Sequence, residues 1–343
     1  MRFNIFKVGR SLAIDLGTAN TLVCIKGRGI VVREPSVVAI DKYSHKVLAV
    51  GNDADEMLGR TPENIAAIRP LKDGVIADID ITEAMLRRLI HTALGKKGTI
   101  FKPRVTVCVP TGITNVEKRA VVQAFMLAGA KTVTLIEEPM AAALGAGIDV
   151  MRPEGNMIVD IGGGTCEAAV IALGGVVSSR SVKLAGGALN NSIINYIKRK
   201  YALTIGDKTA EEIKLELGSA VPYENEGMYE VRGRDSATGL PKNIAISATE
   251  VREAMAENIA IIIEEIRDTL GITPAELTAD ILKNGITLTG GGALIKNIDK
   301  AIEDEIGVPV KIAEEPLDCV VLGTELATEN ENILLRSPVA RHI

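Results

Sequence analysis

The feature that most limits how this chain can fold is the segment Asp160-Ile161-Gly162-Gly163-Gly164-Thr165. Apolar runs at 157–159 and 168–171 enclose it, and each run predicts a buried strand. Glycines let backbone N–H groups approach a polyphosphate closely, and a carboxylate can face Mg²⁺ or its water ligands. A tight hairpin with an incidental Asp explains the same residues equally well, so the segment alone leaves both interpretations open.

The same plan occurs near the N-terminus. An apolar run ends at Asp15, a turn follows through Gly17-Thr18, and residues 22–25 predict a second strand. In both copies a glycine hairpin, Gly27–Gly29 or Gly174-Gly175, lies about 12 to 15 residues after the Asp. We interpret this as an internal repeat in which two Asp-glycine turns hold one triphosphate from opposite sides. A chance recurrence of strand hairpins is the alternative.

Length and composition limit the class of protein. At 343 residues the chain exceeds one typical core, so two domains are expected. Hydrophobic content of 47% with 24% charged residues is typical of a soluble globular protein, and we expect neither a membrane-spanning helix nor a signal peptide. The net charge of -5 disfavours nucleic-acid binding. Four scattered cysteines without a CxxC pair fit reduced thiols in a cytoplasmic protein.

Two short segments, residues 1–10 and the loop at 95–104, combine apolar side chains with cations. The apolar residues concerned are Phe3, Ile5, Phe6, Ile100 and Phe101. Apolar residues ringed by Lys and Arg suit insertion into an anionic membrane interface. A frayed or docked terminus, and packing of the loop on the strand expected at 105–109, are the alternatives.

Helical spacing and capping signals predict the helices. They are expected over 53–60, 62–68, 79–94, 114–127, 140–144, 192–200, 251–270, 274–282 and 320–327, and another follows from Ala293. Thr114 with Glu117, and Ser247 with Glu250, have the spacing of capping boxes. Thr209 is expected to cap a further helix with Glu212 at its third position, which explains Glu212 structurally.

Three further segments contain residues that can orient a water or contact a nucleotide. Either Glu137 or Glu138, at a junction between a strand and a helix, can orient a water, although charge at a helix N-terminus explains Glu137 better. Glu211 and Lys214 share a helix face and can meet a ribose or base, or form a surface ion pair. The glycines at 290–292 can approach a base or the α-phosphate.

Together these segments resemble the actin/Hsp70/sugar-kinase ATPase superfamily and, very closely, its bacterial actin family, MreB. The matching motifs, in family order, are Asp15–Leu22, Glu34–Ala39, Arg69–Ile76, Ile136–Ala143, Asp160–Thr165, Thr209–Lys214 and Leu288–Ala293. The resemblance implies an α/β, actin-like ATPase fold in which two duplicated RNase H-like domains with small insertions flank a nucleotide cleft. Domain I would span 1–147 with an insertion at about 33–75, domain II would span 148–315 with an insertion at about 183–245, and 316–343 would return to domain I.

The resemblance also implies roles for individual residues. Asp15 and Asp160 would face Mg²⁺ through water, and Glu138 and Thr165 match the positions that order the attacking water. The implied ATP-binding residues are Gly17, Thr18, Ala19, Asn20, Gly162, Gly163, Gly164, Glu211, Glu212, Lys214, Gly290, Gly291, Gly292 and Ala293.

The implied function is that of a cytoskeletal ATPase whose hydrolysis is coupled to the assembly of membrane-associated filaments, which organise cell-wall elongation and set rod shape. The implied partners are further copies of the chain in paired protofilaments, the anionic inner membrane at its cytoplasmic face, and membrane proteins such as MreC, MreD and RodZ. Family members usually carry an acidic run where this chain has Gly187–Asn191, and that departure bears on the hydrolysis rate and on protofilament pairing.

Two other functions of the same superfamily remain as alternatives. A sugar-type kinase needs a substrate-binding insertion and an Asp base, and we find no insertion large enough. An Hsp70-like chaperone is expected to carry a peptide-binding domain after the ATPase, for which the sequence leaves no room.

Overall fold

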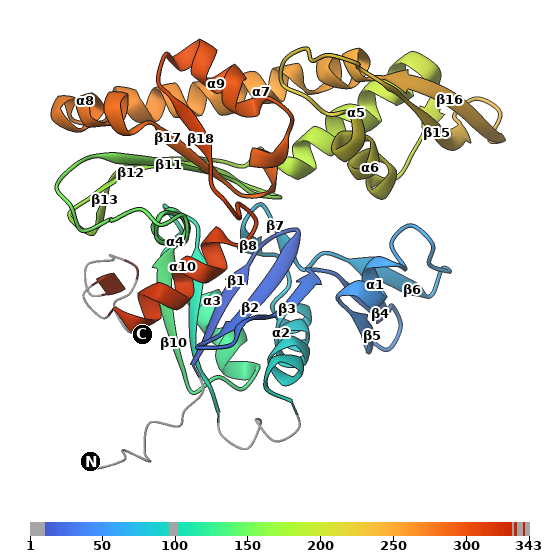
Figure 1. The fold of residues 1–343 in the computed structure, drawn as a ribbon. Coiled ribbons are helices and arrows are strands. Elements are labelled where there is room, and N and C mark those ends of the chain that lie inside the picture. The colour runs from blue at the N-terminus through green and yellow to red at the C-terminus, as the bar shows by residue number, and fades with distance from the viewer. Residues whose placement is uncertain (1–10, 96–101, 331–332, 335–338, 340–343) are drawn as a thin grey trace. The chain divides into compact units, whose positions relative to one another are not determined.

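The computed structural model describes residues 11–95, 102–330, 333–334 and 339, which form two compact units (Figure 1). Unit 1 contains the described residues up to Glu154, the segment Ile171–Ser179 and those from Leu317 onward. Unit 2 contains Gly155–Val170 and Arg180–Pro316. The domain and insertion boundaries expected from the sequence stay predictions.

The main sheet of unit 1 has the strand order β10-β9-β1-β2-β3. Its strands are β1 (Ser11–Leu16), β2 (Asn20–Ile25), β3 (Gly29–Pro35), β9 (Arg104–Val109) and β10 (Thr132–Glu137). β1, β2 and β3 pair antiparallel, whereas β9 is parallel to both β1 and β10. The end of β1, at Asp15 and Leu16, therefore lies beside the end of β9 in the same sheet.

Helices cover this sheet because its strands are apolar on both faces. They are α2 (Ile79–Leu94), α3 (Asn115–Leu127), α4 (Glu138–Gly145) and α10 (Cys319–Glu329). The apolar stripe of α2 and the side chain of Phe125 in α3 are buried against β1 and β9. α4 and α10 pack so closely that a Cβ added to Gly323 would lie 1.7 Å from the Ala141 carbonyl oxygen. A glycine is therefore required at this crossing.

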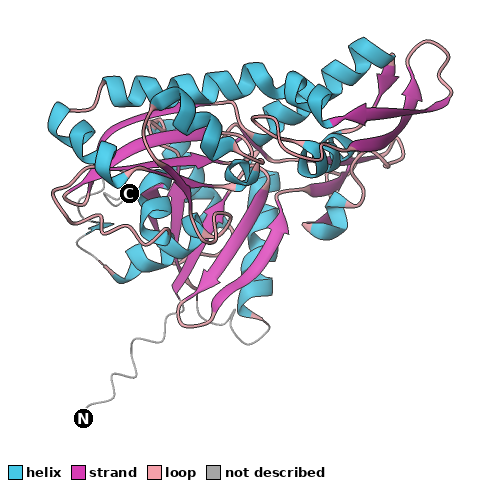
Figure 2. Ribbon diagram, turned by 45° about the horizontal axis from the view of Figure 1, so that its top comes forward, coloured by secondary structure: helices cyan, strands magenta, loops and turns pink. Residues whose placement is uncertain are grey.

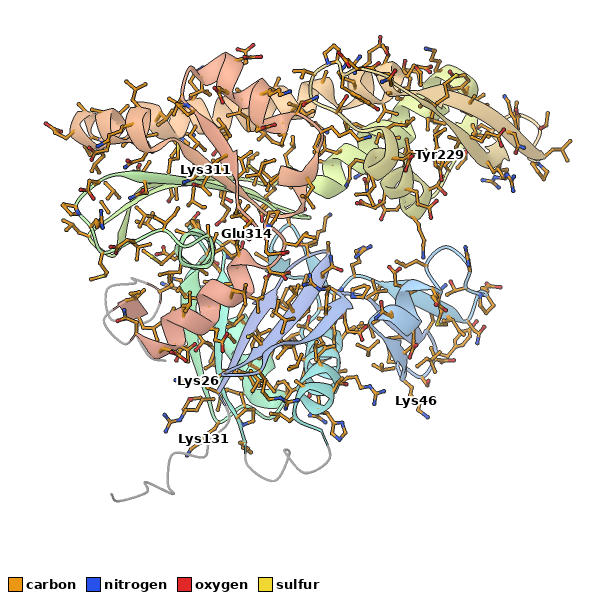
Figure 3. All side chains as sticks on the ribbon, in the orientation of Figure 1. Lys26, Lys46, Lys131, Tyr229, Lys311 and Glu314 are labelled. Carbon is orange, nitrogen blue, oxygen red and sulfur yellow. The ribbon has the colours of Figure 1, made fainter. Side chains whose placement is uncertain are left out.

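A smaller sheet in unit 1 has the order β5-β4-β6, with β4 at Val38–Asp41, β5 at Val47–Val50 and β6 at Ile65–Ile68. The helix expected over 62–68 is wrong, because residues 65–68 pair antiparallel with β4. Only α1 (Asn52–Asp55) forms within the expected helix at 53–60. β7 (Leu71–Lys72) and β8 (Val75–Ile76) make a short hairpin. In Figure 3, Lys46 marks the outer end of the β4–β5 hairpin.

The second main sheet has the order β13-β12-β11-β17-β18. Its strands are β11 (Asn156–Ile161), β12 (Cys166–Ala172), β13 (Gly175–Val182), β17 (Ile286–Thr289) and β18 (Val310–Ile312). β17 is parallel to both β11 and β18. In both main sheets the first three strands are consecutive in the chain, and two later strands extend the sheet parallel to the first of them. The internal repeat expected from the sequence is therefore confirmed.

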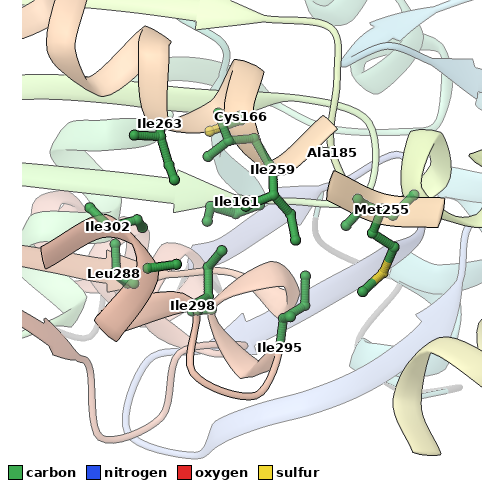
Figure 4. Close-up of a cluster of buried hydrophobic side chains, with 14 of the residues drawn as sticks. Ile161, Cys166, Ala185, Met255, Ile259, Ile263, Leu288, Ile295, Ile298 and Ile302 are labelled. Atoms are coloured by element: carbon green, nitrogen blue, oxygen red, sulfur yellow. The ribbon is translucent and has the colours of Figure 1, made fainter. Parts of the chain in front are cut away.

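The remaining elements of unit 2 pack on or beside that sheet (Figure 2). They are α5 (Gly186–Tyr201), β14 (Leu203–Thr204), α6 (Asp207–Leu217), β15 (Met228–Asp235), β16 (Pro241–Ser247), α7 (Ala248–Gly271), α8 (Ala275–Asn284), a 3₁₀ turn (Gly291–Leu294) and α9 (Ile298–Ile306). Their core joins α7 to β11 and β17 through Met255, Ile259, Ile161 and Leu288 (Figure 4). Tyr229 of β15, labelled in Figure 3, packs against this core.

Local capping signals succeeded at two helices and failed at a third. The capping boxes at Thr114 and Ser247 are both formed. The expected cap at Thr209 is wrong, because α6 begins at Asp207 after extended Gly206, and an acidic first residue suits the helix N-terminus. The helix expected from Ala293 is a 3₁₀ turn, and α9 begins only at Ile298.

None of the helices in the described ranges is both long enough and apolar enough to cross a bilayer.

Candidate functional site

The first glycine turn, residues 15–20, joins β1 to β2 in unit 1. A Cβ added to Gly17 would lie 2.7 Å from the backbone oxygen of Asn20, so a larger residue would force the turn open. Asp15, which pairs in register with Leu22, is half-buried. The turn therefore keeps a carboxylate and a tightly folded glycine backbone next to each other.

Residues from elsewhere in unit 1 hold this turn in place. The hydroxyl of buried Ser36 donates to the Gly17 carbonyl at 2.6 Å, and the Ser36 N–H donates to the Ala19 carbonyl at 2.9 Å. Arg69 donates to the same Ala19 carbonyl at 3.3 Å, and the Gly74 N–H donates to the Thr18 hydroxyl at 3.1 Å. The motifs at 34–39 and 69–76 thus brace the first glycine turn, a role that sequence reasoning did not assign to them.

Cys108 at the end of β9 is a neighbour of Asp15 that sequence reasoning missed. Its thiol donates to Asp15 Oδ1 at 3.4 Å. Burial raises the pKa of the Cys108 thiol well above its usual value, and the charges of Asp15 and Glu138 raise it further. The charges of both Asp15 and Glu138 therefore act on the buried Cys108 thiol.

The two glutamates before Pro139 differ in their surroundings. Glu137 is the N-cap residue of α4, makes no side-chain cap hydrogen bond and is buried. Its burial raises the pKa of its carboxyl, and the positive charge of Lys118 acts to lower it. Glu138 is the first residue of α4 and is half-buried. Of the two, Glu138 is the less buried residue, which agrees with its expected role beside a water.

The second glycine turn, residues 160–165, joins β11 to β12 in unit 2. Asp160 is buried, and the Thr289 hydroxyl donates to its Oδ1 at 2.7 Å. Burial raises the pKa of the Asp160 carboxyl, while this hydrogen bond opposes the rise. The Gly162 N–H donates to the Thr165 carbonyl at 2.9 Å, and a Cβ on Gly162 would lie 3.2 Å from that oxygen. The carboxylate and the folded glycine turn are again adjacent.

The third glycine run packs against the second turn. Gly290 has φ +78°, and a Cβ there would lie 2.4 Å from the Ile161 carbonyl oxygen. A Cβ on Gly292 would lie 2.2 Å from Ile161 Cγ2. Both glycines are thus explained by close packing on the residue after Asp160, and this packing brings Gly291 and buried Ala293 to the same region of unit 2.

α5 and α6 are joined to the second turn through backbone contacts. The N–H groups of Gly186 and Gly187 donate to the carbonyls of Gly162 and Gly163 at 3.1 and 2.8 Å. Lys214 Nζ donates to the Gly186 carbonyl at 3.3 Å and to Glu211 Oε2 at 2.7 Å. Glu211 and Lys214 therefore belong to one network with the glycines of the second turn, whereas Glu212 is exposed.

The structure thus groups the candidate residues within each unit. Asp15, the first glycine turn and Glu138 lie in unit 1, and the remaining nucleotide, metal and water candidates lie in unit 2. The membrane candidates Phe3, Ile5, Phe6, Ile100 and Phe101 fall outside the described residues. The role of each residue stays a prediction.

The donors present suit a magnesium nucleotide. Within residues 11–95 and 102–330, no three or more His, Cys, Asp or Glu side chains gather as a metal cage. Mg²⁺ needs only one or two protein carboxylates because phosphates and waters complete its octahedral shell. Asp15 in unit 1 and Asp160 in unit 2 are each a carboxylate of this kind, and each precedes a tightly folded glycine turn.

Comparison with known proteins gives consistent matches over nearly the whole chain. The family model for the MreB/Mbl protein matches residues 9–336. Cell shape-determining protein Mbl of Bacillus cereus is 52% identical over 321 residues, covering 94% of this chain and 96% of the relative. Cell shape-determining protein MreB of Escherichia coli is 51% identical over 322 residues, covering 93% of each.

Comparison with solved structures also matches this chain to an MreB protein. MreB 5 of Spiroplasma citri, in crystal structures bound to AMPPNP and to ADP, superposes with a TM-score of 0.90 at 40% identity. The match covers 95% of this chain and 98% of that one. The fold is therefore the actin-like α/β fold that the sequence predicted.

Proposed function

This chain belongs to the MreB/Mbl family, and from that premise we propose that it is a cytoskeletal ATPase that polymerises and determines cell shape. The observation that carries the proposal is the duplicated turn: an Asp at the end of β1 and of β11, each followed by a folded glycine turn in which a Cβ on Gly17 or Gly162 would crowd a backbone oxygen. The nucleotides bound by the Spiroplasma citri relative support ATP as the ligand.

Asp15 and Asp160 are the residues that would hold Mg²⁺, and the glycine turns would receive the phosphates. Bound Mg²⁺ would neutralise the charge that develops on the β- and γ-phosphate oxygens. Glu211 and Lys214 meet the ribose and base, and the backbone at 290–293 closes the base pocket. Because phosphoryl transfer requires little covalent work from the protein, these residues act by position and charge.

Glu138 and Thr165 orient the water that attacks the γ-phosphate. Glu138 suits this role because it is the half-buried first residue of α4 and because its charge, like that of Asp15, acts to raise the pKa of the Cys108 thiol. Loss of one such group lowers the rate of a proton-transfer step by about 10²- to 10⁴-fold.

Filaments of this protein lie on the cytoplasmic face of the inner membrane and organise cell-wall elongation. The names of the Bacillus and Escherichia relatives support the role in cell shape. Membrane attachment rests on the sequence alone, through the apolar residues among cations at 1–10 and 95–104. Further copies of the chain, anionic lipid and membrane proteins such as MreC, MreD and RodZ are the proposed partners.

Nucleotide binding, phosphate release and sedimentation test the proposal. The purified chain should bind ATP with Mg²⁺, release phosphate and form sedimentable filaments. Glu138→Ala should lower phosphate release by about 10²-fold or more while ATP stays bound. A chain that stays monomeric with every nucleotide would refute the cytoskeletal role, and unchanged phosphate release in Glu138→Ala would refute the assignment of the water-orienting residue.

A further inference from the structure

Asn190 in α5 is a buried amide between two carboxylates of α6. It is 4% exposed. Its Nδ2 donates to Glu211 Oε2 at 2.7 Å and to Asp207 Oδ1 at 3.3 Å. Ionised carboxylates only accept hydrogen bonds, so the nitrogen of the amide must be the atom that faces α6. The side chain is therefore oriented by its two acidic neighbours.

The oxygen of the Asn190 amide differs from the nitrogen in its hydrogen bonding. Asn190 Oδ1 is buried and has no hydrogen-bond partner within the residues that the structure describes. A buried acceptor without a partner is unfavourable and uncommon in folded proteins. An apolar residue of similar size would avoid this cost, so the two bonds that Nδ2 donates are the feature that calls for an amide here.

Those bonds act on the residue expected to meet the ribose. Glu211 Oε2 receives both Asn190 Nδ2 and Lys214 Nζ, each at 2.7 Å. The Lys214 side chain is only 9% exposed, whereas that of Glu211 is 42% exposed. One edge of the carboxylate is thus fixed by buried donors while the group stays accessible, as a carboxylate that accepts a hydrogen bond from a ligand hydroxyl must be.

The neutral charge of Asn190 also matters at this place. A carboxylate at position 190 would face Asp207 and Glu211 at hydrogen-bond distance, and like charges so close disfavour ionisation of all three. The amide instead supplies donors to both acids. This gives one position of the altered Gly187–Asn191 segment a specific role beside the proposed nucleotide site.

We propose that Asn190 is a positioning residue that acts through Glu211 on a ribose hydroxyl of the nucleotide, and so favours ATP over its deoxy analogues. This inference rests on the proposed function. Asn190 itself touches Glu211 and Asp207, while the contact to the ligand is made by the Glu211 carboxylate.

The test measures dissociation constants for ATP, 2′-deoxy-ATP and 3′-deoxy-ATP, each with Mg²⁺. The wild-type protein should prefer ATP to at least one deoxy analogue. Asn190→Ala and Glu211→Ala should each reduce that preference about five- to tenfold, mainly by weakening ATP, because the net loss of one hydrogen bond has about this size. The double variant should show little further loss, since the two residues act as one unit.

Two further variants keep the inference open to refutation. Asn190→Leu keeps the number and branching of the side-chain heavy atoms but removes the donors, and it should reproduce the loss of preference even if Asn190→Ala folds poorly. Ser192→Ala removes a hydrogen bond between α5 and Asn258 of α7 without touching Glu211, and it should keep the wild-type preference.

The outcomes separate the two proposals. If the wild-type protein binds ATP but shows no ribose preference, or if the Asn190 variants weaken all three nucleotides equally along with the melting temperature, Asn190 is only structural and the inference is overturned. If the wild-type protein does not bind ATP, the proposed function itself fails.

Discussion

At the scale of single residues, the two aspartates proposed for Mg²⁺ differ in what donates to them. Asp160 receives a hydroxyl from Thr289 at 2.7 Å, whereas Asp15 receives the weaker thiol donor of Cys108 at 3.4 Å. Asp160 is also the more buried of the two. The Thr289 hydroxyl therefore favours the charged state of Asp160 against the effect of burial.

Thr289→Val should shift the pH dependence of Mg-ATP binding. Burial raises the pKa of Asp160, and the Thr289 hydroxyl opposes that rise by stabilising the carboxylate. Without the hydroxyl the pKa rises further, so the aspartate protonates earlier as the pH falls. ATP affinity, titrated by fluorescence from pH 8 to pH 4, should then be lost at a higher pH than in the wild-type protein.

Thr287→Val is the matched control, because Thr287 is buried in the same strand and pairs with Ile158 rather than Asp160. It should leave the midpoint of the titration unchanged. Equal midpoints for Thr289→Val and the wild-type protein would show that the hydroxyl does not tune Asp160.

At the scale of elements, the crossing of α4 and α10 sets the position of Glu138. Gly323 and Gly145 let the two helices meet at backbone contact, since a Cβ on Gly145 would lie 1.8 Å from the Cys319 carbonyl oxygen. Glu138 is the first residue of α4, so any movement of this helix moves the proposed water-orienting carboxylate.

Gly323→Ala should separate the two helices and lower both stability and hydrolysis. Overpacking of this kind costs about 1–3 kcal/mol or more. We expect a lower melting temperature, faster hydrogen exchange in α4, and a larger loss of phosphate release than of ATP affinity. Leu326→Ala, on the exposed side of α10, should change none of these, and a normal rate of phosphate release in Gly323→Ala would contradict the coupling.

The capping box of α7 ties this helix to α5. Glu250 accepts the Ser247 N–H at 2.8 Å, the Tyr201 hydroxyl at 2.5 Å and Lys200 at 2.9 Å. Burial acts to raise the pKa of Glu250, but these bonds together lower it to about 2. The stabilisation is therefore complete above the ordinary pKa of 4.5 and is lost as the pH falls through about 2.

Glu250→Gln should cost about 1 kcal/mol of stability near pH 7 and should weaken the dependence of stability on pH between about 5 and 2. Urea unfolding at several pH values measures both effects. Glu257→Gln, on an exposed position of the same helix, controls for the lost charge. If the two variants had the same pH profile, the capping box would not contribute to acid unfolding.

At the scale of the whole molecule, the proposed membrane attachment can be separated from assembly. A variant without residues 1–10 and with Ile100→Ser and Phe101→Ser should still form filaments with Mg-ATP but should no longer sediment with anionic vesicles, because it has lost its apolar residues among cations. Vesicles of neutral lipid are the control and should bind even the wild-type protein weakly. Unchanged co-sedimentation of the variant would refute the membrane assignment.

The sequence by itself determined the features that depend on neighbours along the chain. The Asp-glycine turns after β1 and β11, the capping boxes at Thr114 and Ser247 and the limits of α2 all follow from local spacing, which the folded chain preserves. Local signals failed where a partner strand or an extended glycine decided the outcome, as at 62–68, where pairing with β4 overrode the expected helix.

Only the tertiary structure decided which distant side chains surround those turns. Ser36 and Arg69 on the first turn, Cys108 beside Asp15 and Asn190 between the acids of α6 leave no periodic trace in the sequence. Each contact depends on sheet order and helix packing, which sum many weak interactions over the whole fold. The sequence therefore identifies the two carboxylates and their glycine turns, and the packing of distant elements determines how each is held and charged.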